Sequence, residues 1–267
     1  MTLIRKNSQI FQIDPSTQTY SWWLNCFSKW EPMTFLIFDL FLNKSKNLID
    51  IGSWIGTTVL YAAKISKNVY AIEPDPHSVI DLKKNIEINH LTNIYLCSRP
   101  IYNQITEIYF GPYADTWNSS SSQIKSKQIR NIDQLMRTIT LKNLIDEYQI
   151  VDVGLIKVDI EGGEENIIID LFNEAAKMNP KPPIYLSFHL SWWNNTDLSR
   201  FDQCWTQYLY IYHAGGQNPP MGSLCMDPKG EEIPKLDEKN LIQNQHISEF
   251  VQKFPFASLL FTDQLIK

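Results

Sequence analysis

The stretch Leu48-Ile-Asp-Ile-Gly-Ser-Trp-Ile-Gly56 decides the fold of this chain. A short apolar run ends at Asp50, turns at Gly52 and leads through Gly56 into an amphipathic segment. Gly52 permits a tight turn, and Gly56 lets a ligand or a strand approach the helix start closely. The pattern predicts a small-molecule site at the carboxyl end of a strand, against a helix N-terminus.

A second acidic residue follows at a spacing typical of nucleotide-binding units. The apolar run Val69–Ile72 ends in Glu73, which lies 21 positions after Gly52. This is close to the spacing at which a carboxylate meets a ribose diol in nucleotide-binding βαβ units. Trp54 stands where a dinucleotide fingerprint has glycine, which argues against NAD or FAD. S-adenosylmethionine has a ribose and no phosphate and suits the turn better; an ordinary βα turn with a solvated Glu73 is the alternative.

Composition limits the classes of function. The chain has 267 residues, 43% of them hydrophobic, and a formal charge of −5, so no basic surface for nucleic acid is expected. Its apolar runs are too short to span a membrane, and its N-terminus lacks the apolar core of a signal peptide. Four widely spaced cysteines favour reduced thiols. We therefore expect a cytoplasmic protein with a small-molecule or glycan substrate and no membrane insertion; a homo-oligomer stays open.

The chain divides into a preface and one domain. Residues 1–47 are predicted to form a helical preface, with an aromatic stripe at Trp22, Trp23, Phe27 and Trp30 that packs in the core. Residues 48–267 are predicted to form a single domain. Its predicted strands are 48–51, 69–72, 94–97, 155–158 and 184–188, and its predicted helices are 57–67, 77–89, 142–148 and 165–177. Such alternation implies a mostly parallel sheet.

Three further strands are expected outside this alternation. Residues 105–110 have the period of an edge strand. Residues 208–212 and 258–262 would complete the sheet as an antiparallel hairpin.

Several segments together resemble one family, the FkbM-type S-adenosylmethionine-dependent methyltransferases. The matching segments are Trp30–Pro32, Leu48–Gly56, Tyr70–Pro76, Asn85–Asn89, Thr140-Leu141 and above all Ile156-Lys-Val-Asp-Ile-Glu-Gly-Gly-Glu164. The resemblance covers about Trp30 to His189. It implies the class I methyltransferase fold, a Rossmann-like α/β domain with a mostly parallel seven-stranded sheet and helices on both faces. It also implies O-methylation of a sugar or natural-product hydroxyl.

Two departures from the family pattern concern the substrate side. The family often has an acidic residue before the histidine that ends the fifth strand, where this chain has Ser187-Phe188-His189. No family motif is found beyond Asn194, so the resemblance leaves the acceptor open.

The doubly wound topology would bring several strand ends to one rim. We expect the turn after Asp50 to face the methionine moiety, Glu73 to hold the ribose and Ser98 to lie near the adenine. Glu31 meets the cofactor's amino group or lies at the surface. The predicted cofactor-binding residues are Glu31, Asp50, Gly52, Ser53, Gly56, Glu73, Pro74 and Ser98.

The acceptor side is predicted at the ends of the fourth and fifth strands. His189 is the expected general base, since an ordinary imidazole has a pKa of about 6.5, and Asp159 is its catalytic partner. Asp159 and Glu161 orient His189, bind acceptor hydroxyls or hold a divalent cation such as Mg²⁺; we favour a site without metal. Tyr113 and Trp192 would suit the face of a sugar, with burial in the core as the competing interpretation for the tryptophan.

The leading hypothesis is an S-adenosylmethionine-dependent O-methyltransferase that acts on a hydroxyl of a sugar or glycan. One alternative is methylation of a lipid, polyketide or peptide hydroxyl in the same fold. Another is a cofactor-binding scaffold subunit without catalysis.

Overall fold

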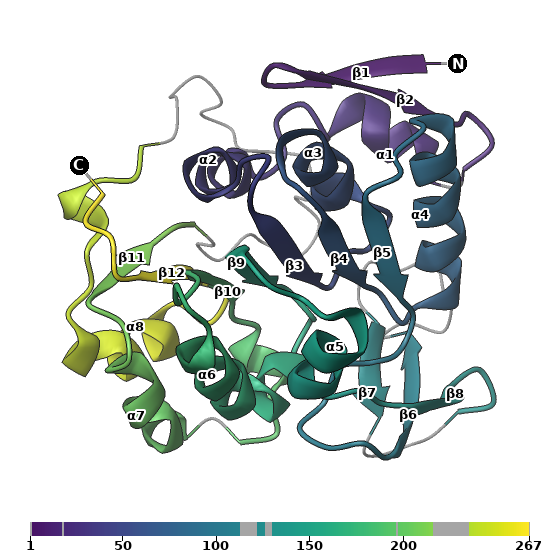
Figure 1. Ribbon diagram of the computed structural model, residues 1–267. Helices are drawn as coiled ribbons and strands as arrows, with labels where there is room; N and C mark the ends of the chain where they lie inside the picture. Colours follow the sequence, from purple (N-terminus) through teal and green to yellow (C-terminus); the bar gives the residue numbers. More distant parts are fainter. Residues whose placement is uncertain are drawn as a thin grey trace.

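The main element of the fold is a seven-stranded sheet in the order β11-β12-β10-β9-β3-β4-β5 (Figure 1). The computed structural model describes residues 2–17, 19–112, 122–125, 130–195, 197–215 and 235–266. The strands of the sheet are β3 (Asn47–Ile51), β4 (Val69–Ile72), β5 (Ile94–Cys97), β9 (Val153–Val158), β10 (Ile184–Ser187), β11 (Tyr210–His213) and β12 (Ser258–Thr262). Neighbouring strands from β5 to β10 are parallel, whereas β12 is antiparallel to both β10 and β11.

Helices cover both faces of this sheet, as Figure 1 shows. The helices are α1 (Tyr20–Asn25), α2 (Pro32–Phe41), α3 (Thr57–Ile65), α4 (Pro76–Ile88), α5 (Leu141–Tyr148), α6 (Ile168–Lys177), α7 (Asp202–Trp205) and α8 (Ile247–Lys253). Short 3-10 turns are η1 (Gly163–Asn166), η2 (Leu190–Trp192), η3 (Leu198–Phe201), η4 (Glu238–Asn240) and η5 (Asn244–His246). α2 and α3 pack on one face, and α5, α6 and α7 pack on the other. The predicted α/β fold is confirmed.

Alternation along the strands separates the two cores. In β3, Leu48 packs with α2 and α3, whereas Ile49 and Ile51 pack with the helices of the opposite face. Successive side chains of a strand point to opposite faces, so Asp50 points toward α3 with Leu48. This orientation matters for the site, because the side chain of Asp50 is directed into the layer of helices rather than along the strand.

The helices begin where local hydrogen bonding dictates. Asp75 caps α4, and its carboxylate accepts the backbone N–H groups of His77 (2.8 Å) and Ser78 (3.1 Å). Pro76 occupies the first turn of that helix, where its missing N–H costs nothing. Thr140 caps α5 by accepting the N–H of Asn143, as the sequence suggests. These caps fix the ends of the helices beside the carboxyl edge of the sheet.

The N-terminal preface differs from the prediction of a purely helical segment. It begins with an antiparallel pair, β1 (Thr2–Lys6) and β2 (Gln9–Ile13), before α1 and α2. The prediction is wrong for residues 2–13, because Gln9–Ile13 alternates in burial with period two and Asn7 makes the turn at a φ of 49°. Phe11 of β2 packs against Phe27 and Tyr61, so the hairpin joins the core on the α3 side.

A second, smaller sheet lies beside the main one. It has the order β7-β6-β8, with β6 (Glu107–Pro112) between β7 (Ser122–Lys125) and β8 (Gln134–Arg137). The expected edge strand therefore exists, but it is central in its own antiparallel sheet. It pairs with β7 and β8 and not with the edge strand β5 of the main sheet.

The C-terminal strands pair as predicted, although they are not joined by a tight turn. β11 and β12 are antiparallel neighbours, and α8 lies between them in the chain. Cys97 and Cys204 are free and buried, whereas Cys26 is disulfide-bonded, so the expectation of reduced thiols is wrong for Cys26. No helix in the described ranges is long and apolar enough to cross a membrane.

Candidate active site

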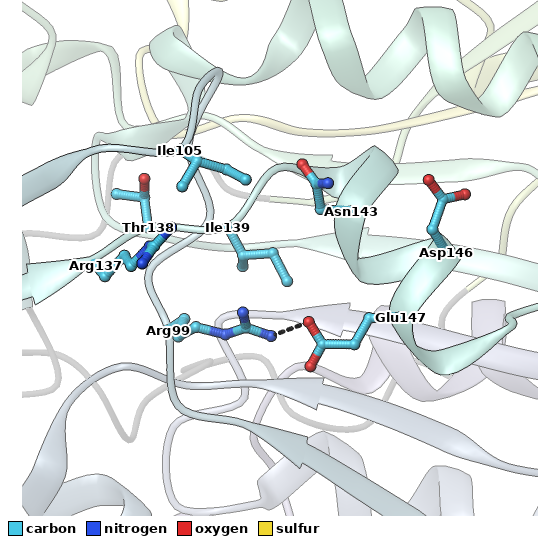
Figure 2. A pocket seen from close by; sticks show the side chains of 8 residues that line it. All are labelled: Arg99, Ile105, Arg137, Thr138, Ile139, Asn143, Asp146 and Glu147. Atoms are coloured by element: carbon cyan, nitrogen blue, oxygen red, sulfur yellow. Dashed lines mark hydrogen bonds and ion pairs between the residues drawn. The ribbon is translucent and has the colours of Figure 1, made fainter.

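Two cavities lie near the carboxyl ends of the parallel strands. Figure 2 shows the first, which has arginines on one side and the side chains of α5 on the other. Its ion pair, Arg99 with Glu147 at 2.6 Å, is solvent-exposed on both partners and so contributes little binding energy on its own. The second cavity is lined by the Gly52 turn and the acidic turn after β9 together with buried charges, and it is the candidate active site.

The second cavity, called here the cofactor cleft, lies where three neighbouring strands end. Gly52 follows β3, Glu73 follows β4, and Asp159 follows β9. The lining residues are Trp22, Trp30, Glu31, Gly52, Trp54, Thr57, Glu73, Pro74, Asp75, Ser78, Phe110, Lys157, Asp159, Ile160 and Glu161. Both acidic and aromatic side chains therefore line the cleft.

The floor of the cleft depends on the Gly52 turn. Gly52 has a φ of +87°, and a Cβ at this position would lie 1.8 Å from the carbonyl oxygen of Asp159. The N–H of Asp159 donates to the carbonyl of Ile51 at 2.9 Å, which ties the two turns together. A side chain at position 52 is thus excluded by both conformation and space.

Glu73 holds the adjoining turn closed with both carboxylate oxygens. It accepts the backbone N–H of Trp54 at 2.7 Å and that of Asp75 at 2.8 Å. The side chain is 7% exposed, and burial raises the pKa of Glu73 to about 8 against the effect of these two N–H donors. Each oxygen keeps a further lone pair, so hydroxyl groups of a ligand can still be accepted.

A buried ion pair lies beneath the cleft. Asp50 and Lys157 are cross-strand partners in the β3–β9 register, and their charged atoms are 3.3 Å apart. Lys157 also lies 3.7 Å from Asp159 and donates to the carbonyl of Gly52 at 3.3 Å. Burial alone would lower the pKa of Lys157, but the carboxylates of Asp50 and Asp159 outweigh it and raise that pKa. Lys157 therefore stays charged.

Glu31 approaches the same charges from the preface. It precedes α2 with a left-handed φ of 41°, and it accepts the Thr34 hydroxyl at 2.9 Å. Burial and the nearby Asp159 carboxylate raise the pKa of Glu31 to about 7, although Lys157 opposes them. The expectation that Glu31 faces the cofactor cleft, rather than the surface, fits this position.

His189 stands among three carboxyl groups at the acceptor side. Its Nδ1 lies 2.7 Å from Glu164, and its Nε2 lies 3.6 Å from both Asp159 and Glu161. Glu164 is fully buried and also accepts the N–H groups of Ile160 and Gly162. The indole of Trp193 donates to it as well, at 3.0 Å. The orientation of the imidazole is therefore fixed by Glu164.

These carboxyl groups change the acid–base character of the cluster. Burial would lower the pKa of His189, but Glu164, Glu161 and Asp159 together raise it to about 10. Burial likewise raises the pKa of Glu161 to about 8, although the charge of His189 opposes it. A histidine with this pKa is protonated at neutral pH, which differs from the neutral imidazole that the sequence suggests for a general base.

Some predicted cofactor residues lie outside the cleft. Asp50 is fully buried under it and Ser53 is also fully buried, with its hydroxyl donating to the carbonyl of Asp50. Gly56 serves packing, since a Cβ there would lie 2.7 Å from Leu82 of α4. Ser98, just after β5, is exposed and does not line the cleft. Glu31, Gly52, Glu73 and Pro74 do line it.

The predicted acceptor residues separate in a similar way. Asp159 and Glu161 line the cleft, and His189 lies directly behind them. Trp192 stacks on His189, with ring centroids 5.3 Å apart and planes 4° apart, and is not among the lining residues. Tyr113 lies outside the described residues.

Several lining residues were not predicted as site residues. Trp22 and Trp30 were expected in the core, yet together with Trp54 they form the aromatic wall, with Trp22–Trp54 centroids 4.9 Å apart. Trp30 directly precedes Glu31, but the sequence has no comparable signal for Trp22. Lys157 and Glu164 were also missed; a lysine inside the apolar strand Val153–Val158 signals a buried counter-charge.

The comparison with family models identifies one family. A family model for the methyltransferase FkbM domain matches residues 50–211, more than half of the chain. The FkbM methyltransferase structure from Methylobacillus flagellatus KT is 15% identical, with a TM-score of 0.47, covering 82% of this chain and 44% of that one. An rRNA methylase from Streptococcus thermophilus is 10% identical, with a TM-score of 0.45, covering 87% and 95%. A putative methyltransferase from Streptococcus mutans, solved with S-adenosylhomocysteine, is 9% identical, with a TM-score of 0.41, covering 86% and 95%. No curated protein matches the sequence significantly.

Proposed function

The chain belongs to the FkbM family of S-adenosylmethionine-dependent methyltransferases, and from this premise we propose that it methylates a hydroxyl of a sugar or glycan. The observation that carries the proposal is the composition of the cofactor cleft. Trp22 and Trp30 line this cleft together with the carboxyl groups of Asp159 and Glu161. Aromatic rings pack against the C–H faces of a sugar, while carboxylates accept its hydroxyls. A purely apolar acceptor would leave these carboxyl groups without partners.

The cofactor would occupy the part of the cleft between the first two strand ends. Glu73 is in position to accept the ribose hydroxyls, and the Gly52 turn leaves room for the methionine moiety. The carboxyl groups of Glu31 and Asp159 line this part of the cleft and would accept the ammonium group of the cofactor. Cofactor binding here therefore rests on shape and on charge together.

The transfer itself is a displacement at the methyl carbon. The acceptor oxygen forms a bond to this carbon while the bond from carbon to sulfur breaks, and S-adenosylhomocysteine leaves. The hydroxyl proton passes to the Asp159 carboxylate. His189, which faces Asp159 at 3.6 Å, already carries a proton at neutral pH and balances the charge of the cluster. Because the sulfonium is already activated, the main task of the protein is to hold the oxygen about 3 Å from the methyl group.

Two measurements test the proposal in order. Calorimetry with S-adenosylmethionine and S-adenosylhomocysteine should show binding of both, and failure of both to bind would refute the cofactor assignment. Mass spectrometry of an acceptor panel then compares mono- and oligosaccharides with hydroxylated lipids, polyketides and peptides. Methylation confined to the non-sugar members would contradict the sugar assignment, and no methylation with normal cofactor binding would favour the scaffold alternative.

The role of His189 has its own test. We expect His189→Ala to keep its affinity for S-adenosylhomocysteine and to lose at least about 100-fold in rate. His246→Ala is the matched control, since His246 is exposed and lies just before α8. Turnover of His189→Ala at the rate of this control would remove His189 from catalysis.

A further inference from the structure

The acceptor side carries a donor set that suits a metal ion. We propose that Asp159, Glu161 and His189 bind one divalent cation at the edge of the cofactor cleft. The binding stands on geometry alone, and only its role in methyl transfer rests on the proposed function. The sequence alone favours a site without metal. The structure favours a metal site instead, because it shows that the side chains of Asp159, Glu161 and His189 lie close together.

Distances within the cluster suit ligands of one ion better than partners in hydrogen bonds. Each residue offers one ligand atom, and these atoms lie within 4.8 Å of one another. The Nε2 of His189 lies 3.6 Å from Asp159 Oδ1 and 3.6 Å from Glu161 Oε2, too long for a hydrogen bond. Ligands about 2.1 Å from a tetrahedral ion are separated by about 3.4 Å. A cation between the three atoms accounts for this spacing.

Glu161 supplies an independent observation. Its Oε2 is buried and has no hydrogen-bond partner. A buried acceptor without a donor costs about 1–3 kcal/mol, so proteins rarely leave one unless something binds it. The same atom is the ligand atom closest to His189 Nε2, and a cation there provides the missing partner.

The imidazole of His189 has the carboxylate contact that is typical of metal-binding histidines. Ligating histidines almost always direct the other ring nitrogen to a carboxylate or carbonyl, which fixes the tautomer and ring orientation. Here Glu164 takes that position at 2.7 Å from Nδ1, while Trp192 stacks on the ring. Glu164 is itself fixed by two backbone N–H groups and an indole. This leaves Nε2 directed at Asp159 and Glu161, and a divalent cation that binds there would release the proton of Nε2 to solvent.

The nearby cation Lys157 does not replace the proposed ion. Its ammonium lies 3.7 Å from Oδ2 of Asp159, the oxygen opposite the one that faces His189, and pairs more closely with Asp50. Asp159 can therefore contact Lys157 and a metal with different oxygens. A mixed set of one nitrogen and two oxygens suits Mn²⁺, Fe²⁺ or Zn²⁺ better than Ca²⁺. Next to the cleft, such an ion would stabilise the developing alkoxide of the acceptor.

The test uses Mn²⁺ alone as the probe on the full-length protein. Calorimetry and the electron paramagnetic resonance signal of free Mn²⁺ should show one saturable site, weakened at least about 100-fold in Asp159→Asn and in Glu161→Gln. Glu164→Gln, which alters the residue that holds both His189 and the acidic turn, should weaken binding about 10- to 100-fold. Glu165→Gln is the matched control, because Glu165 adjoins the cluster but accepts the N–H of Asn194 instead. It should bind Mn²⁺ as the wild type does.

Three outcomes would overturn the metal site. These are no saturable binding by the wild type, undiminished binding by both Asp159→Asn and Glu161→Gln, and an equal loss in Glu165→Gln. S-adenosylhomocysteine binding in the presence of a chelator shows that each variant is folded. Normal binding of this product without Mn²⁺ binding refutes the metal alone, whereas Mn²⁺ binding without methylation of any acceptor refutes the proposed function alone.

Discussion

The buried ion pair beneath the cofactor cleft allows a quantitative test of the structure. In Lys157→Met, the ammonium is removed from a site where the side chains of Lys157 and Asp50 are 2% and 0% exposed. Asp50 then retains the Thr58 hydroxyl at 2.5 Å, while its other oxygen has no partner. An uncompensated buried charge of this kind lowers the free energy of unfolding by about 3–5 kcal/mol.

The reverse substitution should be milder. In Asp50→Asn, Lys157 keeps Asp159 at 3.7 Å and the carbonyl of Gly52 at 3.3 Å, so we expect a loss of about 1–3 kcal/mol. The double variant has no unpaired charge left in the strands and should cost about as much as Asp50→Asn alone. The coupling energy between the two positions then equals the loss in Lys157→Met, about 3–5 kcal/mol in magnitude.

Urea denaturation of the three variants and the wild type, at pH 7 and without cofactor, measures these differences. Lys177→Met serves as the control, since the Lys177–Glu174 pair has 65% of the lysine side chain exposed and should cost less than about 1 kcal/mol. Two results would refute the account: a loss in Lys157→Met no larger than in the control, or single-variant losses that add to within about 0.5 kcal/mol in the double variant.

Two further predictions concern the turns of the cleft. Gly52→Ala should abolish S-adenosylhomocysteine binding in calorimetry, because its Cβ would lie 1.8 Å from a backbone oxygen. In Gly56→Ala the Cβ meets only a leucine methyl, so this variant should lose about 1–3 kcal/mol of unfolding free energy in urea denaturation. Equal losses of binding and of stability in the two variants would contradict this reasoning. Because the pKa of Glu73 is raised from 4.5 to about 8, the folded state holds a proton that the unfolded chain releases. The wild-type free energy of unfolding should therefore decrease from pH 4.5 to pH 8, and Glu73 contributes up to about 1.4 kcal/mol per pH unit to this decrease. Glu73→Gln should remove that contribution. Parallel curves of unfolding free energy against pH for the two proteins would refute the prediction.

The central strands were the most predictable part of the fold. Their apolar runs are short, buried on both faces and bounded by turn residues, so Val69–Ile72 begins and ends where the sequence indicates. The edge strand Ile94–Cys97 also has its predicted bounds, although Tyr95 is exposed. The N-terminal hairpin was not predictable in the same way. Its strands bury only one face, and their polar residues obscure the alternation of Gln9–Ile13. The edge position predicted for residues 105–110 is wrong for another reason. An alternation of apolar and polar residues indicates that a segment is a strand, but it does not indicate which strands pair with it.

The site was predictable where backbone geometry places a residue beyond the end of a strand. Gly52, Glu73 and Asp159 follow their strands directly and line the cleft. Asp50 is still inside β3, so alternation directs its side chain toward α3 and the partner strand. The aromatic wall was missed for a different reason: Trp22 and Trp30 reach the cleft through tertiary packing of the preface, which local spacing does not encode.

The two glycine turns explain why the acidic motif has its particular spacing. A Cβ at Gly52 would strike the carbonyl of Asp159, and a Cβ at Gly162 would lie 2.8 Å from Cβ of Trp192. The first glycine lets the end of β9 close against the end of β3, and the second lets the segment with His189 close against the acidic turn. Asp159 and Glu161 can then face His189 from one side while Glu164 holds it from the other. The two glycines therefore act by letting backbone segments approach each other closely. A variant that keeps all the acidic residues but carries a side chain at Gly52 or Gly162 should lose the contacts between His189 and its carboxyl groups.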